Sequence, residues 1–133
     1  MRILLVDVPG LLGQRLAAAL ERHHEVSVLD GDPRDRDTAA RATSTVDTVV
    51  CGLPDLLAGH ADPLVALDRA SRGVYNLITT AAGANRFVLL SSLWPFERYP
   101  LDHAVTEYWA PRPTTDLQDL IPVVAEQSFA RQA

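Results

Sequence analysis

The chain has 133 residues, a length typical of one domain with its own hydrophobic core. Its formal net charge of −5 argues against nucleic acid or an anionic membrane surface as a main partner. A single cysteine, Cys51, excludes a disulfide within the chain and favours a reducing compartment such as the cytoplasm, and the apolar run at 3–6 is too short for a membrane span or a signal peptide.

The first half of the chain alternates apolar runs with amphipathic or polar segments. Three runs have the composition of strands, and the first is expected to be fully buried at the centre of a sheet; they cover 2–7, 25–30 and 46–52. Between them, residues 11–23 carry a leucine stripe of helical spacing, and 32–43 are typical of a short polar helix with Pro33 near its first turn.

The second half begins with one long helix and one further strand. Asp62 and Pro63 are typical of a helix start, and the apolar stripe that follows predicts a helix to about residue 82. Residues 86–92 have the composition of a fourth buried strand. Strands that alternate with helices pair in parallel through right-handed crossovers. The sequence therefore predicts an α/β fold, a single domain with a doubly wound parallel sheet of about four to five strands.

The region from 94 to 122 is rich in proline and aromatic residues. This composition predicts an ordered but irregular segment rather than a linker. A terminal helix is expected at 116–131, where Thr115 and Gln118 have the spacing of a capping box. Pro122 is expected to kink this helix or to split it in two.

The stretch VDVPGLLGQRL at 6–16 lies where a nucleotide-binding protein has its glycine-rich turn. The three glycines of such a turn make a tight bend, let the backbone approach a pyrophosphate, and allow close packing of helix on strand. Aspartate stands in the first place, where it tolerates left-handed geometry but could repel phosphate. A plain strand–helix turn is the alternative interpretation. The candidate cofactor-binding residues here are Asp7, Gly10, Leu11, Leu12 and Gly13.

Further candidate binding residues lie at two strand ends. Asp30 ends the second predicted strand, where an acidic side chain bonds the adenosine ribose and disfavours a 2′-phosphate, so NAD is expected rather than NADP. A solvated carboxylate is the alternative. At the end of the third strand, Cys51 and Gly52 are candidate cofactor-binding residues. Gly52 could admit a cofactor close to the backbone, while Cys51 is expected to be a small buried residue rather than a nucleophile. The histidines have no metal-ligand spacing, and no metal site is predicted.

With these residues placed, the chain resembles the extended short-chain dehydrogenase/reductases, the NAD-dependent epimerase/dehydratase family. The resemblance covers nearly all of the chain but only about the first half of a typical member. The stretch at 6–16 is similar to the family's T-G-x-x-G-x-x-G turn, and GVYNLITTAAGANRFVLLSS at 73–92 is similar to its G-T-x-N-L-L-x-A-A and R-F-V-x-x-S-S segments. The resemblance implies a Rossmann-like, NAD(P)-binding domain over 1–133.

The resemblance also locates the catalytic positions. Ser92 matches the family's active-site serine, and Glu126 matches the glutamate that follows its Y-x-x-x-K dyad. Counting back from Glu126 puts Gln118 and Pro122 where tyrosine and lysine belong, and all 12 basic residues of the chain are arginines. Without a lysine, the family's route to a lowered tyrosine pKa is missing. Tyr99 and Tyr108 are the candidate substitute acids, with packing of the aromatic segment as the alternative.

Three functions remain open at this point. The first is a protein that binds NAD, or less favourably NADP, without standard dehydrogenase chemistry. The second is an atypical NAD-dependent oxidoreductase or epimerase, in which Ser92 orients a small-molecule substrate and Tyr99 moves the proton. The third is an interaction protein that retains only the fold. Because the family commonly dimerises through its last matched helix, the resemblance implies a homo-oligomer. The net charge of −5 predicts that neither nucleic acid nor a membrane is a partner.

Overall fold

The computed structural model describes residues 1–53, 62–81, 83–100, 102 and 104–131, without the side chain of Gln118. Its four parallel strands form one sheet in the order β2-β1-β3-β4, as the sequence predicts for a doubly wound fold. In the register of this sheet, Leu5 lies beside Val28 on one side and beside Val50 on the other. The strands are β1 (Arg2–Val6), β2 (Glu25–Val28), β3 (Thr48–Cys51) and β4 (Arg86–Leu89).

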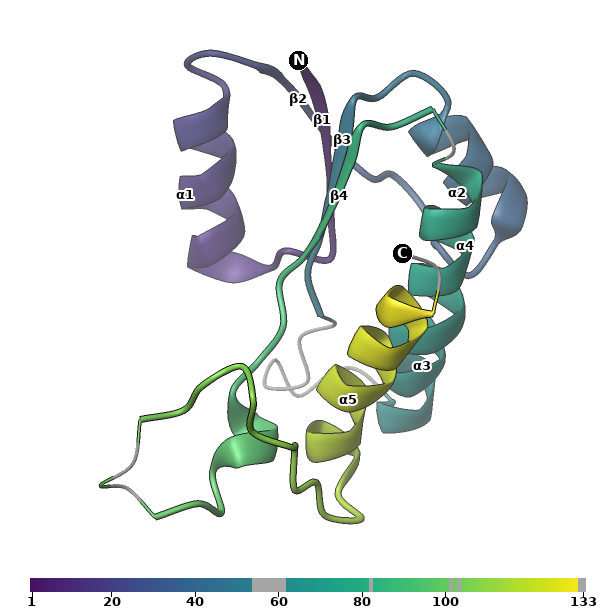
Figure 1. Cartoon of the computed structure of the whole chain (residues 1–133). Helices are drawn as coiled ribbons and strands as arrows, with labels where there is room; N and C mark the ends of the chain where they lie inside the picture. The colour runs from purple at the N-terminus through teal and green to yellow at the C-terminus, as the bar shows by residue number, and fades with distance from the viewer. Residues whose placement is uncertain (54–61, 82, 101, 103, 132–133) are drawn as a thin grey trace.

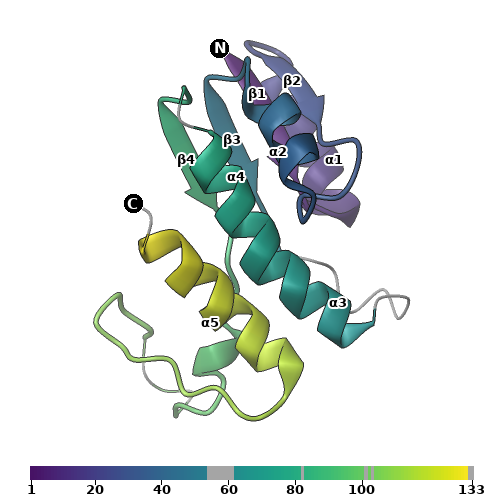
Figure 2. The ribbon, with the colours of Figure 1, turned by 90° about the vertical axis from the view of Figure 1, so that its right-hand side faces the viewer.

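Helices cover both faces of the sheet (Figure 1). On one face lies α1 (Gly10–Leu20), and on the other lie α2 (Arg36–Thr43), α3 (Pro63–Asp68), α4 (Val74–Thr80) and α5 (Leu117–Ala130). Figure 2 shows α4 and α5 side by side on this second face. The chain winds outward from β1 to β2 and then back to β3, so right-handed crossovers place α1 and α2 on opposite faces.

The hydrophobic core has one layer on each face of the sheet. The larger layer joins β1 and β3 to α4 and α5 through Leu4, Val49, Leu77 and Ile121, each no more than 2% exposed. The smaller layer consists of buried residues of β1 and β3 covered by α1. Because successive side chains of a strand point to opposite faces, β1 contributes to both layers, as expected of a central strand.

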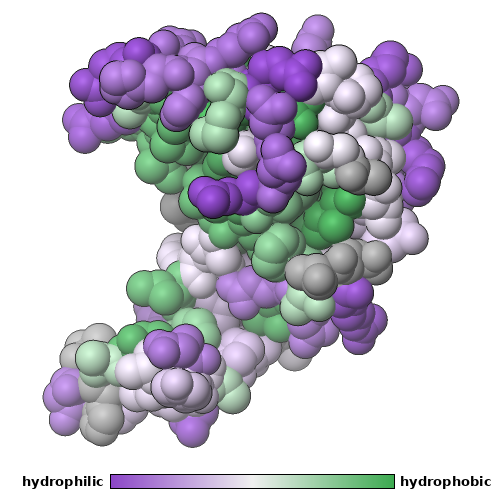
Figure 3. Space-filling model, turned by 45° about the horizontal axis from the view of Figure 1, so that its top comes forward, coloured by the Kyte–Doolittle hydropathy of each residue, from purple (hydrophilic) through white to green (hydrophobic). Residues whose placement is uncertain are grey.

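The two outer strands are exposed to different degrees. The prediction that 86–92 form a fully buried strand is wrong, because β4 is an edge strand of the described sheet and its residues are half-buried or exposed. At the other edge, Val28 of β2 is 69% exposed. Figure 3 shows hydrophobic surface in the middle of the face in view, with hydrophilic surface along the top and the right. Part of the apolar surface of this small sheet therefore reaches solvent.

The long helix predicted from Asp62 consists of α3, a π-helical turn at Arg69–Gly73, and α4. As the sequence predicts, the Asp62 carboxylate caps the start and accepts the Leu64 N–H at 2.9 Å. The π-helical turn has no signature in the periodicity of the sequence, and such turns are rare and often lie at functional sites. Here the turn begins at Arg69, which becomes important below.

The helix α2 begins later than predicted. Asp35 is its N-cap and accepts a backbone N–H from the first turn, so Pro33 precedes the helix instead of lying in it. Pro33 is buried beside Gly73, where an added Cβ would lie 3.1 Å from the Pro33 Cγ. The Asn76 side chain donates to the carbonyl oxygens of Pro33 and Arg34 at 3.1 and 2.9 Å. The loop between β2 and α2 is thus fixed to the helix on the second face.

The start of α5 also differs from the prediction. Its N-cap is Asp116, so the capping box expected between Thr115 and Gln118 is wrong. Instead, the Thr114 N–H donates to a carboxylate in the first turn at 3.0 Å. Pro122 lies inside α5 without splitting it, since a proline in the second turn removes only one hydrogen bond and its ring is buried here.

The irregular segment after β4 folds around Tyr99. The Tyr99 and Trp109 ring centroids are 4.3 Å apart, and the Arg112 guanidinium carbon lies 4.1 Å from the Tyr99 ring centroid. The Tyr99 hydroxyl donates to the Ala110 carbonyl at 2.9 Å. In Figure 1 this segment lies beyond the carboxyl ends of the strands. The aromatic residues therefore give the segment a small cluster of its own.

Candidate functional site

The candidate site is the turn between β1 and α1, at the carboxyl edge of the sheet. Asp7 directly follows β1 and has a φ of +49°, which confirms the left-handed geometry considered for it. Gly10 has a φ of +63°, and an added Cβ would meet no atom within 4 Å. At Gly13, by contrast, an added Cβ would lie 1.9 Å from the Val8 carbonyl oxygen. Gly13 is therefore needed for packing, while Gly10 supplies backbone geometry beside open space.

The end of β3 packs against the same turn. The Gly52 N–H donates to the Val6 carbonyl at 2.7 Å, and an added Cβ would lie 2.2 Å from the Asp7 carbonyl oxygen. Cys51 is 1% exposed, as predicted for a small buried residue. Burial, and secondly the negative charge of Asp7, raise the pKa of the Cys51 thiol to about 12. This burial and the raised pKa favour a packing role for Cys51 over one as a nucleophile.

The first turn of α1 is open to an anionic ligand. Its N-cap, Pro9, has no side chain that could cap it, and the first turn contains no acidic residue. Leu11 and Leu12 in this turn are 61% and 62% exposed. The first N–H groups of a helix lack intrahelical partners, and the helix dipole is positive at this end. Such an arrangement can bind a phosphate or another anion.

A pocket of about 320 Å³ adjoins the turn on the α1 side of the sheet. Its volume is in the range of small-molecule sites, and most of its side chains are apolar. Asp30 lies just beyond β2 and is exposed. The pocket is lined by Leu5, Val8, Ala17 and Val28, together with Gln14 and the two glycines Gly10 and Gly13.

The carboxylate of Asp7 binds Arg69. The Arg69 Nε lies 2.9 and 2.7 Å from the two carboxylate oxygens, and the side chains of Asp7 and Arg69 are 16% and 26% exposed. The hydrogen bond to Asp7 raises the pKa of Arg69 against the opposing effect of burial. Within the described hydrogen bonds, no side chain caps the first turn of α1. The charge expected to repel a phosphate is therefore paired with a cation.

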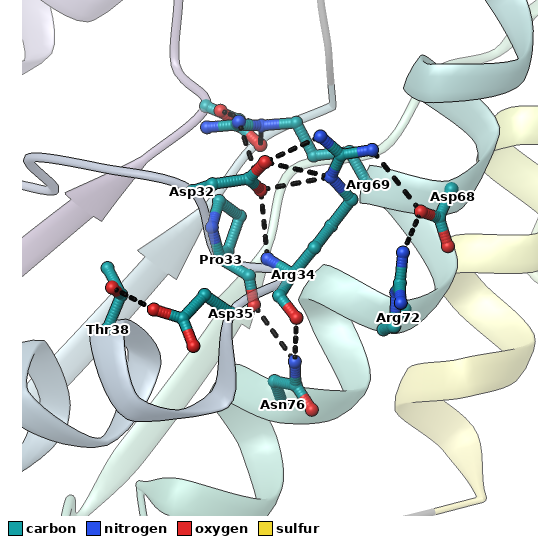
Figure 4. A network of polar contacts seen from close by, with 10 residues as sticks. Asp32, Pro33, Arg34, Asp35, Thr38, Asp68, Arg69, Arg72 and Asn76 are labelled. Atoms are coloured by element: carbon teal, nitrogen blue, oxygen red, sulfur yellow. Dashed lines mark hydrogen bonds and ion pairs between the residues drawn. The ribbon is translucent and has the colours of Figure 1, made fainter.

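Arg69 also belongs to a longer chain of ion pairs (Figure 4). Its Nη1 lies 3.5 Å from Asp32, whose carboxylate accepts hydrogen bonds from the Arg34 Nε and Nη2 at 2.9 and 2.6 Å. Arg34 reaches Asp68 at 3.3 Å, and Asp68 also binds Arg72. The Arg34 hydrogen bonds are the largest cause that lowers the pKa of Asp32. This chain joins the turn after β1, the loop after β2 and the π-helical turn.

The predicted catalytic residues, Ser92 and Tyr99, lie after β4, and each makes a hydrogen bond with a backbone group. The Ser92 hydroxyl oxygen accepts the Trp94 N–H at 3.2 Å, and the neighbouring Ser91 donates to the carboxylate of Glu126 in α5. Among the described residues, no hydrogen bond joins Ser92 to Tyr99, whose hydroxyl is bound to a carbonyl oxygen. Catalytic roles for Ser92 and Tyr99 remain predictions.

No metal centre is found in the described part of the chain, where no three His, Cys, Asp or Glu side chains gather in a way that could hold an ion. His23 is exposed and His24 is half-buried, whereas His60 and His103 lie outside the described residues.

Sequence reasoning missed Arg69 as a site residue. Asp7 lies 62 residues before Arg69, and no spacing rule connects the two. The one available signal was the acidic residue in a glycine position, since a half-buried carboxylate needs a cationic partner. That signal indicates a partner but does not identify which of the arginines supplies it.

No protein-family model matches the chain, and no curated protein sequence matches it at a significant level. Solved structures do match its fold. A short-chain dehydrogenase/reductase superfamily protein from Agrobacterium tumefaciens with bound NAD is 23% identical with a TM-score of 0.80, and the match covers 97% of this chain and 44% of that one. The UDP-glucose 4-epimerase of Thermus thermophilus in complex with NAD is 20% identical with a TM-score of 0.82, over 98% and 50%.

The dTDP-4-dehydrorhamnose reductase of Bacillus anthracis in complex with NADP is 15% identical with a TM-score of 0.77, over 98% of this chain and 49% of that one. The chain thus spans about half the length of these proteins. At these identities the likeness establishes the fold, which is Rossmann-like.

Proposed function

We propose that this chain is a nicotinamide-dinucleotide-binding domain of the extended short-chain dehydrogenase/reductase type. The turn after β1 carries the proposal, because it keeps left-handed geometry at Asp7 and Gly10 and close packing at Gly13 and Gly52. The residues present fit a dinucleotide, since Gly10 borders open space and α1 starts without a side-chain cap. Solved proteins of the same fold in complex with NAD or NADP support it.

In this proposal the N–H groups at the start of α1 hold the diphosphate, and Leu11 and Leu12 lie in the same turn. Asp30 bonds the adenosine ribose, and Gly52 lets the cofactor approach the end of β3. We favour NAD over NADP because Asp30 and Asp32 place two carboxylates after β2, and Arg34 is already paired with Asp32. A 2′-phosphate there would meet like charge.

We further propose that the domain binds the cofactor without the standard dehydrogenase chemistry. A bound nicotinamide supplies hydride transfer, but this chain has no lysine to assist a tyrosine. The ring contacts of Tyr99 favour a packing role for it. The alternative is an atypical oxidoreductase or epimerase that uses Ser92. Hydride transfer to a small-molecule carbonyl would support this alternative if Ser92→Ala abolishes it.

Exposed apolar residues and the single cysteine bear on the oligomeric state and the location of the protein. We propose a homo-oligomer through α5 and its neighbours, since Leu64, Val65 and Tyr75 of α3 and α4 are at least 40% exposed. The free, buried thiol of Cys51 fits the cytoplasm. Of the described helices, none has the length and apolar character needed to cross a membrane. Light scattering during size-exclusion chromatography tests the assembly, and a monomer at all concentrations would contradict it.

Calorimetric titration with NAD, NADH and NADP tests the main proposal. We expect heat with NAD and NADH, weaker binding of NADP, and weaker NAD binding in Asp30→Ala. Gly10→Ala should weaken NAD binding because alanine is strained at a φ of +63°, whereas Gly83→Ala is the matched control, with ordinary φ and no atom within 4 Å of the added Cβ. The absence of both binding heat and a thermal shift with millimolar dinucleotide would refute the proposal. That result would favour an interaction protein that retains only the fold.

A further inference from the structure

Asp7 presents an electrostatic problem to any diphosphate bound at α1. It lies three residues before the first helical residue, in the turn that must accept the ligand. A dinucleotide diphosphate carries two negative charges, so a bare carboxylate at Asp7 would oppose its binding. The first turn of α1 has no basic side chain of its own, since it consists of glycines and leucines. A positive charge that compensates the Asp7 carboxylate must therefore come from another part of the fold.

Arg69 supplies the compensating charge. Its Nε contacts both carboxylate oxygens of Asp7, at 2.7 and 2.9 Å, and both side chains are half-buried. The guanidinium is held from a second side by Asp32, at 3.5 Å from Nη1. Arg69 is the first residue of the π-helical turn, so an irregularity of the helix lies where this arginine enters the site. The position of the cation is thus built into the second face of the sheet.

We propose that Arg69 is a positioning residue for the dinucleotide, which neutralises Asp7 and holds its carboxylate away from the N–H groups that receive the diphosphate. This inference rests on the proposed dinucleotide-binding function. Asp7 and Arg69 together replace a glycine: Asp7 adopts its left-handed conformation, and Arg69 removes the charge that the replacement brings. The pair therefore acts as a unit. Loss of Arg69 alone leaves the Asp7 carboxylate without its cation, whereas loss of both residues leaves no unpaired carboxylate there.

Binding of NAD, ADP-ribose and adenosine to four proteins tests this inference by calorimetry. The proteins are the wild type, Arg69→Met, the double variant Asp7→Asn with Arg69→Met, and the control Arg72→Met. Arg72 lies in the same π-helical turn and pairs with Asp68, but it is 58% exposed at its side chain and does not contact Asp7. Thermal unfolding and circular dichroism of each variant establish that it is folded.

We expect Arg69→Met to bind NAD and ADP-ribose about tenfold more weakly or worse, as like charges meet in the site. Adenosine, which carries no phosphate, should bind the variant and the wild type equally. The double variant should regain most of the affinity for ADP-ribose, and Arg72→Met should bind as the wild type does. If Arg69→Met does not fold, Asp7→Asn decides, because its uncompensated Arg69 should bind ADP-ribose more tightly than the wild type.

Equal binding of ADP-ribose by Arg69→Met and the wild type would overturn the inference while leaving the proposed function in place. A loss that is the same for adenosine, or that persists in the double variant, would also overturn it, since a damaged fold does not distinguish ligands by charge. Absence of dinucleotide binding by the wild type would contradict the proposed function itself. Binding by the wild type is therefore measured before any variant.

Discussion

Replacement of Gly13 by alanine is the sharpest test of the turn's geometry. An ideal Cβ at Gly13 would lie 1.9 Å from the Val8 carbonyl oxygen, while real Cβ atoms stay at 3.0 Å or beyond, so helix and turn must separate by more than 1 Å. The opposing atom is backbone, which cannot rotate away as a side chain can. Overpacking of this kind costs about 3 kcal/mol. For a domain of this size, that corresponds to a fall in Tm of about 10 °C.

Urea unfolding followed by circular dichroism at 222 nm measures this cost, with Gly83→Ala as the matched control. Gly83 is exposed and an added Cβ meets nothing within 4 Å, so this control should stay within about 0.5 kcal/mol of the wild type. A free energy of unfolding for Gly13→Ala within the same range would refute the close packing of α1 on the turn. It would also remove the reason for a glycine at this position.

Three further predictions concern the core, the thiol and the acid dependence of stability. Leu77→Ala removes a fully buried side chain and should lower the free energy of unfolding by about 3 kcal/mol in urea, whereas Tyr75→Ala on the same helix, at 45% exposure, should cost much less. Cys51, with its pKa raised to about 12 by burial, should react with a maleimide only after unfolding, and rapid labelling of the native protein would contradict its place in the core. Hydrogen bonds from the backbone and side chain of Arg2 lower the pKa of Asp47, so its contribution to stability is fully present above the ordinary carboxyl pKa of about 4 and is lost as pH falls through the lowered value. Asp47→Asn should therefore lower the urea midpoint at about pH 7, and its difference from the wild type should shrink steadily as pH falls below about 4.

The sequence predicted the order and type of the main elements because local signals sufficed for them. The apolar run that became β1, and the aspartate–proline pair at 62 and 63, carry their structural meaning within a few residues. The burial of β4 was predicted wrongly, because the apolar composition of a strand does not reveal whether a second strand lies beside it. Pro122 likewise remained inside α5 because of its position in the helix and its burial, which periodicity alone does not weigh.

The candidate site was predictable where it depends on backbone and unpredictable where it depends on distant charge. Gly10 and Gly13 were identified from their spacing, since the geometry of a turn is local. The partner of Asp7 could not be identified in this way. Arg69 lies 62 residues away in the sequence and begins a π-helical turn that no motif of the segment predicts.

Asp7 shows why a residue of the turn and its distant charged partner must be considered together. A glycine there would need no partner, but aspartate brings a charge that the fold must neutralise inside a half-buried turn. Arg69 does so while also contacting Asp32, which fixes Arg34 and through it Asp68. Substitutions at Asp7 and Arg69 should therefore be strongly non-additive, as expected of side chains in one network. The departure from the glycine pattern is thus a change in how the turn is stabilised, and it makes the loop after β2 part of the same site.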